Sequence, residues 1–144
     1  MYLKNIYKQL DELLESSERI PLGKKDKWVI FSDLHIGNRT KKDDFVRNSE
    51  LFKTALNFYQ NHKFRLFLNG DVEELQRFRY EDIRDKWKDV FELLKQFRGR
   101  GALAKTFGNH DLEFSFNEEA NMDFPAMERE LLDYWYREGI VGKY

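Results

Sequence analysis

The stretch GALAKTFGNHD at residues 101–111 joins a short apolar run to polar side chains that can bind a metal ion. The same arrangement occurs twice earlier, in WVIFSDLH at residues 28–35 and in FRLFLNGD at residues 64–71. Short apolar runs of this kind are typical of buried strands. We therefore predict strands with functional side chains at their ends, over residues 27–32, 64–68 and 102–107.

Two segments with helical periodicity separate these strands. The first spans residues 43–61 and opens with two aspartates that can cap a helix. The second is a long apolar stripe from Ile83 to Phe97, which Gly99 and Gly101 close. Strands that alternate with helices, joined by crossovers of this length, are expected to be parallel neighbours with right-handed connections. The predicted fold class is therefore α/β.

The chain has 144 residues, which is enough for one domain and too few for two ordinary ones. We expect residues 1–20 to be an N-terminal helical extension, with an amphipathic helix over residues 1–16 that packs one face on the body. After the third strand, the pattern predicts an irregular loop at residues 113–125, a helix at 126–138 and the start of a further strand at 139–142.

Composition excludes several classes of function. The formal net charge is -1, with 25 Lys and Arg against 26 Asp and Glu, so no global field attracts nucleic acid or an anionic membrane. There is no cysteine, which excludes disulfides and thiol catalysis and leaves His, Asp, Glu and Asn as metal ligands. The sequence has neither a signal-peptide core nor a long apolar run, so we expect a soluble, cytoplasmic protein without a membrane span.

The polar residues after the strands have the chemistry of a metal site. Loops at the carboxyl ends of parallel strands converge, so these side chains are expected to meet. Asp33 and His35 are two residues apart and point the same way in an extended segment. Asp71 has two oxygens that can bridge two ions, and Asn109 offers an amide oxygen. Such a set suits Mn²⁺, Fe²⁺ or Zn²⁺ better than Ca²⁺.

Two such ions, about 3.5–4 Å apart, would polarise a phosphoryl oxygen and lower the pKa of a bridging water. His110 is then placed to stabilise developing charge or to protonate the leaving oxygen, and Asp111 to orient a neighbouring histidine or ligand. Each signal also has an ordinary structural interpretation: a cap for Asp33, a plain turn for Gly70-Asp71 and a loop histidine for His110. Their joint order and placement favour the metal site.

These motifs, Asp33-x-His35, Gly70-Asp71 and Gly108-Asn109-His110-Asp111, resemble in residues and order those of the calcineurin-like metallophosphoesterases. The sequences SDLHIG and LNGDVEEL around these motifs are most similar to the bacterial branch that includes relatives of UDP-2,3-diacylglucosamine pyrophosphatase. The match covers roughly residues 27–112.

The resemblance implies a set of roles. Asp33 and His35 would bind one ion, Asp71 both ions and Asn109 the second, while His110 would act on the phosphate. It implies two divalent ions, with Mn²⁺ favoured. It also implies a two-sheet sandwich flanked by helices, of which this chain would be the mainly parallel βαβαβ half.

The sequence departs from the family in its histidines. The family completes its site with a further histidine and a Gly-His-x-His motif, whereas the histidines here are His35, His62 and His110. We interpret His62 as a solvated residue at a helix end. Half of a dinuclear site is thus expected in an incomplete domain. We favour the N-terminal fragment of a longer enzyme; the alternatives are a site completed by a second chain and a degenerate member.

The sequence therefore predicts a metal-dependent phosphoester hydrolase acting on a phosphorylated small molecule through a metal-bound hydroxide. The alternative is a catalytically inactive module that serves as a binding scaffold. Nucleic acid is disfavoured as a partner because the net charge is near zero. Arg77 and Arg79 are the best local candidates for binding the substrate's anionic groups, although a solvated helix face explains them as well.

Overall fold

Three parallel strands form one sheet in the computed structural model, which describes residues 2–17 and 19–115. They are β1 (Trp28–Phe31), β2 (Arg65–Asn69) and β3 (Leu103–Thr106), and they lie in this order across the sheet. The predicted α/β class and the parallel βαβαβ order are confirmed. Within those residues there is one sheet, and the second sheet implied by the resemblance is not among them.

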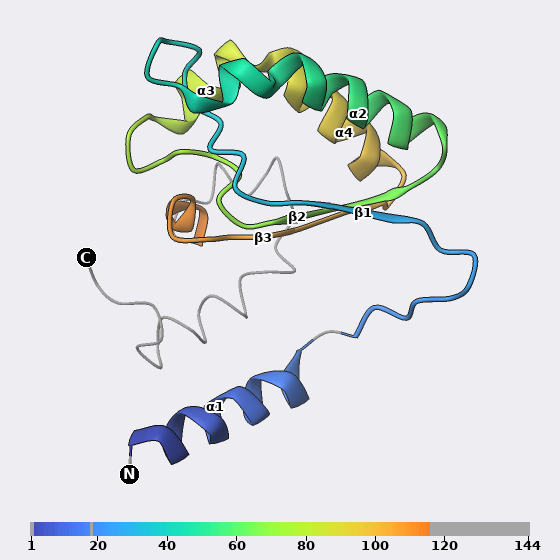
Figure 1. The fold of residues 1–144 in the computed structure, drawn as a ribbon, viewed down its shortest axis with the longest axis vertical. Helices are drawn as coiled ribbons and strands as arrows, with labels where there is room; N and C mark the ends of the chain where they lie inside the picture. The colour runs from blue at the N-terminus through green and yellow to red at the C-terminus, as the bar shows by residue number, and fades with distance from the viewer. Residues whose placement is uncertain (1, 18, 116–144) are drawn as a thin grey trace.

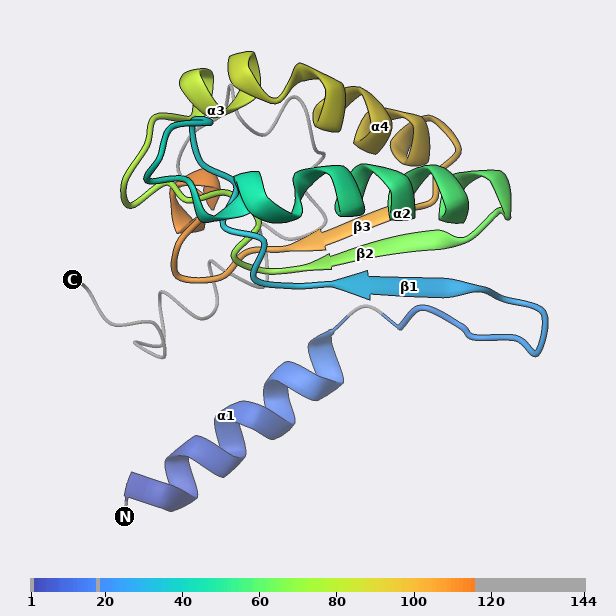
Figure 2. The same ribbon diagram turned by 45° about the horizontal axis from the view of Figure 1, so that its top comes forward.

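Helices cover one face of this sheet (Figures 1 and 2). The 3-10 helix η1 (Asp44–Asn48) and α2 (Ser49–Asn61) join β1 to β2, and α3 (Tyr80–Lys86) and α4 (Lys88–Gly99) join β2 to β3. Strands in sequential order, joined by crossovers of the same hand, place all connecting helices on the same side. The fold thus follows from the order in which strands and helices alternate.

Each of the two helices predicted between the strands is divided into two in the structure, which corrects the sequence interpretation. The break between α3 and α4 lies at Trp87, which is fully buried and has φ -114 and ψ 34. Its indole N–H donates to Asp43 Oδ2 (3.1 Å), and the other oxygen of Asp43 accepts from the Phe45 amide to cap η1. The apolar period continues across the break, so the sequence pattern could not reveal it.

The core lies between the sheet and α2, α3 and α4. Leu66 and Leu68 of β2 are fully buried against helix residues such as Leu56 and Leu94. Burial of one such leucine stabilises the fold by about 1.5–3 kcal/mol. Ile30 of β1 points to the opposite face and is 61% exposed. The helical side therefore provides the packing that holds the strand ends in register.

The N-terminal helix α1 (Tyr2–Ser16) forms as predicted, but its predicted packing is wrong. Leu10 and Leu14, on its apolar stripe, are 48% and 67% exposed. Figures 1 and 2 place α1 on the side of the sheet away from α2 and α4, which already fill the helical face. No helix in the described part of the chain is long and apolar enough to cross a membrane.

The predicted C-terminal elements begin within the described residues and continue beyond them. Residues expected to begin an irregular loop form a short 3-10 helix, η2 (Leu112–Ser115). The rest of that loop, the helix predicted at 126–138 and the strand predicted at 139–142 lie outside the described residues.

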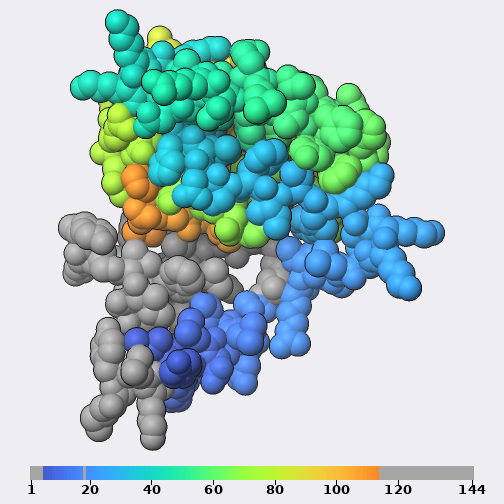
Figure 3. All heavy atoms as spheres, in the orientation of Figure 1, coloured from blue at the N-terminus to red at the C-terminus, as the bar shows by residue number. Residues whose placement is uncertain are grey.

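The carboxyl ends of all three strands point to the same end of the sheet (Figure 2). In the space-filling view, the segments that follow β1, β2 and β3 meet at this end, where teal, yellow-green and orange atoms adjoin (Figure 3). The predicted convergence of the three polar motifs is confirmed at the level of the loops.

Candidate metal centre

The loops after β1 and β2 stay paired beyond the strands. The His35 amide donates to the Asp71 carbonyl (3.0 Å), and the Ile36 amide to the Val72 carbonyl (2.8 Å). Ile36 also forms an isolated parallel bridge with Glu73. This pairing fixes the two predicted ligand motifs side by side.

Three candidate ligands have a left-handed backbone. Asp33, His35 and Asp71 have φ values of 55, 47 and 52, a region that residues other than glycine rarely adopt. Each residue in this conformation destabilises the fold by roughly 1 kcal/mol or more. Such residues cluster at functional sites, where surrounding contacts hold the backbone in place. Here the paired loops provide those contacts.

Two glycines allow the loops after β2 and β3 to touch. A Cβ atom on Gly108 would lie 2.1 Å from Asp71 Oδ1 and 2.9 Å from the Asp71 amide nitrogen. Gly70 has φ +73, and a Cβ there would lie 3.1 Å from the Gly108 nitrogen. Gly108 is therefore required by the close approach of Asp71, and Gly70 is favoured by its positive φ and the nearby backbone of Gly108.

Asp111 binds the backbone of these two loops. Its carboxylate is fully buried and accepts from the amides of Gly108 (2.6 Å), Val72 (2.8 Å) and Asp71 (3.3 Å). We predicted that Asp111 would orient a neighbouring histidine or ligand. The structure places it against the backbone of the candidate ligand Asp71, with no hydrogen bond to a histidine ring among those found in the described residues.

Three of the four predicted ligands come together. The ligand atoms of Asp33, His35 and Asp71 all lie within 4.8 Å of one another, and His35 Nε2 is 3.9 Å from Asp33 Oδ1. Asp71 Oδ1 accepts from the His110 amide (2.8 Å), which leaves the other oxygen for an ion. The fourth, Asn109, is exposed on the adjoining loop. Its backbone carbonyl accepts from the Gln76 side chain (2.9 Å).

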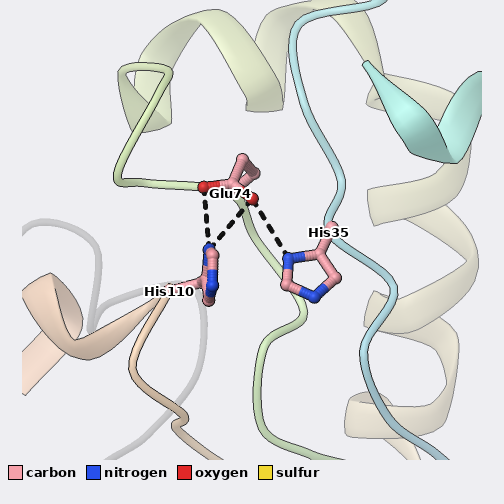
Figure 4. Close-up of side chains that lie close together, drawn as sticks. All are labelled: His35, Glu74 and His110. Atoms are coloured by element: carbon pink, nitrogen blue, oxygen red, sulfur yellow. Dashed lines mark hydrogen bonds and ion pairs between the residues drawn. The ribbon is translucent and has the colours of Figure 1, made fainter. Parts of the chain in front are cut away.

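A residue that the sequence interpretation missed, Glu74, lies between the two site histidines (Figure 4). Its buried carboxylate is 3.1 Å from His35 Nδ1 and 2.9 and 3.0 Å from His110 Nδ1. The two rings are perpendicular, with centroids 4.5 Å apart. The available signal was the pair of glutamates, Glu73 and Glu74, close behind Asp71.

Glu74 decides which nitrogen of His35 can hold a metal. His35, Glu74 and His110 also form a group with ligand atoms within 4.8 Å, but both Nδ1 atoms are already bonded to the carboxylate. An ionised carboxylate only accepts, so each ring donates Nδ1–H to Glu74, and a neutral ring then has its lone pair on Nε2. A carboxylate behind a metal-binding histidine usually acts in this way. An ion held by Asp33, His35 and Asp71 would therefore bind His35 through Nε2.

The local charge also suits a cation. Five carboxyl groups gather here, Asp33, Asp71, Glu73, Glu74 and Asp111, against one buried cation, Lys105, which pairs with Glu73. Burial raises the pKa of Glu73 to about 7; the charge of Lys105 opposes this rise and that of Asp111 adds to it. The donor set of carboxylates and one imidazole fits a divalent ion.

Arg77 and Arg79 lie in the loop before α3, not on a helix face. Arg77 donates to Asp44 Oδ2 (3.3 Å) and to the Lys42 carbonyl (2.6 Å), and Arg79 pairs with Glu81 (3.5 Å) at the surface. Both line shallow hollows outside the metal group. The third histidine, His62, caps α2 and is exposed, as predicted.

Comparison with protein-family models, curated proteins and solved structures finds no match.

Proposed function

We propose that this chain binds a divalent metal ion through Asp33, His35 and Asp71, as part of a metal-dependent phosphoester hydrolase of the calcineurin-like type. The observation that carries the proposal is the Glu74 carboxylate, which bonds Nδ1 of both His35 and His110 and so leaves both Nε2 atoms for chemistry. A structural role alone does not require two histidines from different loops on one buried carboxylate.

A bound divalent ion would supply a Lewis acid for a phosphoryl oxygen and lower the pKa of a coordinated water. Mn²⁺, Fe²⁺ and Zn²⁺ all accept imidazole nitrogen and carboxylate oxygen, and Mn²⁺ is favoured by the resemblance. A second ion would share Asp71 and take Asn109. Asp111, through the backbone of Asp71, keeps that carboxylate in place.

His110 is the candidate for acting on the phosphate. Glu74 holds the ring through Nδ1, and the side chain is 28% exposed, so substrate can reach it. When doubly protonated, the ring donates Nδ1–H to Glu74 and presents Nε2–H to a leaving oxygen. Neutral, it presents a lone pair there.

The ligand count limits what these residues do alone. A second ion would have Asp71 and Asn109 as ligands, and the sequence contains no histidine after His110 to add to them. We propose that one ion binds, and that a full dinuclear site takes ligands from a second chain or a C-terminal half. The same deficit supports a second candidate function, an inactive module that binds a phosphorylated ligand without hydrolysing it.

Calorimetric titration of the metal-free protein with Mn²⁺ tests the proposal, with hydrolysis of bis-p-nitrophenyl phosphate assayed on the same sample. We expect one ion per chain, and loss of binding in His35→Ala. His62→Ala is the matched control, because that histidine is exposed and outside the group. The absence of binding at millimolar Mn²⁺, or equal effects of the two variants, would overturn the proposal. Turnover separates hydrolase from inactive module.

A further inference from the structure

A cationic hollow lies beside the candidate metal centre. Its volume is about 720 Å³, within the usual range of small-molecule sites. Among the residues that the structure describes, three cations and no carboxylate line it. The residues that line it are Asn38, Thr40, Lys41, Lys42, Arg77 and Phe78.

The charges in this hollow are available to a ligand. Lys41 and Lys42 are exposed, and neither ammonium group forms an ion pair within the described residues. Arg77 is partly committed, because it contacts Asp44 and the Lys42 carbonyl. Phe78 adds an aromatic wall that an organic group can contact. Two lysines that form no ion pair in the described part of the chain, beside an aromatic surface, suit a phosphorylated organic molecule.

The loop that carries the lysines is held firmly. Asp43, which is 5% exposed, accepts from the amides of Arg39 (2.7 Å) and Phe45 (2.9 Å) and from the Trp87 indole (3.1 Å). From the other side, Arg77 donates to the Lys42 carbonyl (2.6 Å). A preorganised loop loses less entropy when a ligand binds.

The hollow and the metal centre are adjacent but separate. Asn38 follows His35 by three residues, and Arg77 follows Glu74 by three. The two segments pair through the Glu74 amide and the Ile36 carbonyl (3.0 Å). In Figure 3 the teal segment near residue 40 adjoins the yellow-green segment near residue 77. None of the metal-group residues lines the hollow.

We propose that this hollow binds a second phosphate of the substrate, one separated from the scissile phosphate by an organic spacer. This inference rests on the proposed function, because it assumes that the scissile phosphate lies at the metal centre. The favoured substrate class is an organic bisphosphate. The hollow shares no lining residue with the metal group, so we assign the two phosphates to separate positions joined by a spacer.

Equilibrium binding of fructose 1,6-bisphosphate, fructose 6-phosphate and inorganic pyrophosphate tests the inference, in Mn²⁺ and in EDTA. In Mn²⁺ we expect the bisphosphate to bind about tenfold more tightly than the monophosphate, the gain from one further charge-assisted contact. The double variant Lys41→Ala/Lys42→Ala should lose this advantage. The matched control is Lys24→Ala/Lys25→Ala, an exposed lysine pair outside the hollow.

The two metal conditions separate failure of the inference from failure of the proposed function. Bisphosphate binding in EDTA that depends on Lys41 and Lys42 supports phosphate binding in the hollow, even if Mn²⁺ does not bind. Failure of Mn²⁺ to bind would overturn the proposed function but not this inference. Equal affinity for the two fructose phosphates, or an unchanged advantage in the double variant, overturns the inference. Tighter binding of pyrophosphate than of the bisphosphate overturns the assignment to spaced phosphates.

Discussion

Replacement of Glu74 by glutamine tests how the candidate site is organised. Glu74→Gln keeps the shape of the side chain but removes its charge and turns one acceptor oxygen into a donor. The two oxygens of Glu74 now accept from Nδ1 of both His35 and His110, at 2.9–3.1 Å. In either orientation of the glutamine amide, its NH2 group faces at least one ring nitrogen that donates in the original site. That ring must turn or move its proton to Nε2.

The magnitude follows from the burial of the carboxylate. The Glu74 side chain is 4% exposed, so water cannot replace the lost acceptor. Loss of a carboxylate behind a metal-binding histidine typically weakens metal binding about 10–100-fold, which corresponds to about 1.4–2.7 kcal/mol. We expect the Kd for Mn²⁺ to rise by this factor in Glu74→Gln.

Isothermal titration calorimetry at fixed pH and ionic strength measures this Kd. The matched control is Glu92→Gln on α4, where the side chain is 66% exposed and pairs with Lys95 (3.0 Å). Surface changes of this kind usually alter stability by less than about 0.5 kcal/mol, and no metal effect is expected. A Kd in Glu74→Gln within about threefold of the original value would refute the reasoning, because it lies below the expected range.

Three further predictions concern the backbone and the buried charges. Gly108→Ala should abolish Mn²⁺ binding in calorimetric titrations, because the new Cβ would lie 2.1 Å from Asp71 Oδ1. The control is Gly99→Ala, whose Cβ meets nothing within 4 Å and which should leave the Mn²⁺ affinity unchanged. Asp111→Asn should lower the free energy of unfolding by about 2–4 kcal/mol in urea titrations, since three amides lose a charged acceptor; a loss near zero would contradict the assigned contacts. Because burial raises the pKa of Glu73 from 4.5 to about 7, the folded state keeps a proton that the unfolded chain releases. The free energy of unfolding should therefore fall as pH rises through that window, and Glu73→Gln should flatten the profile.

The fold was largely predictable because its signal is local. β1 and β2 are mostly apolar, β3 begins with Leu103 and Ala104, and Gly99 and Gly101 close α4 as the sequence indicates. The break at Trp87 was not predictable, since the apolar period continues through it and the cause is a hydrogen bond to Asp43, far along the chain. The exposed stripe of α1 was missed because periodicity identifies a helix face but not what it packs against.

In the candidate site, too, one part was predictable from the sequence and another was not. Asp33, His35 and Asp71 were predicted to converge because parallel strands end at one edge, and they do. The position of Glu74 depends on two rings from two different loops, and nothing local in the sequence specifies that contact. The amide partners of Asp111 likewise follow from how the loops approach each other.

The central claim is that a metal ion binds His35 through Nε2 while Glu74 holds Nδ1–H. Nitrogen-15 NMR of the imidazole rings, recorded while one equivalent of Zn²⁺ is added, tests it most directly. We expect the His35 Nε2 resonance to move to the position of a metal-bound nitrogen, with Nδ1 still protonated in both His35 and His110. Loss of the Nδ1 proton from His35, or a spectrum that Zn²⁺ does not change, would contradict the account.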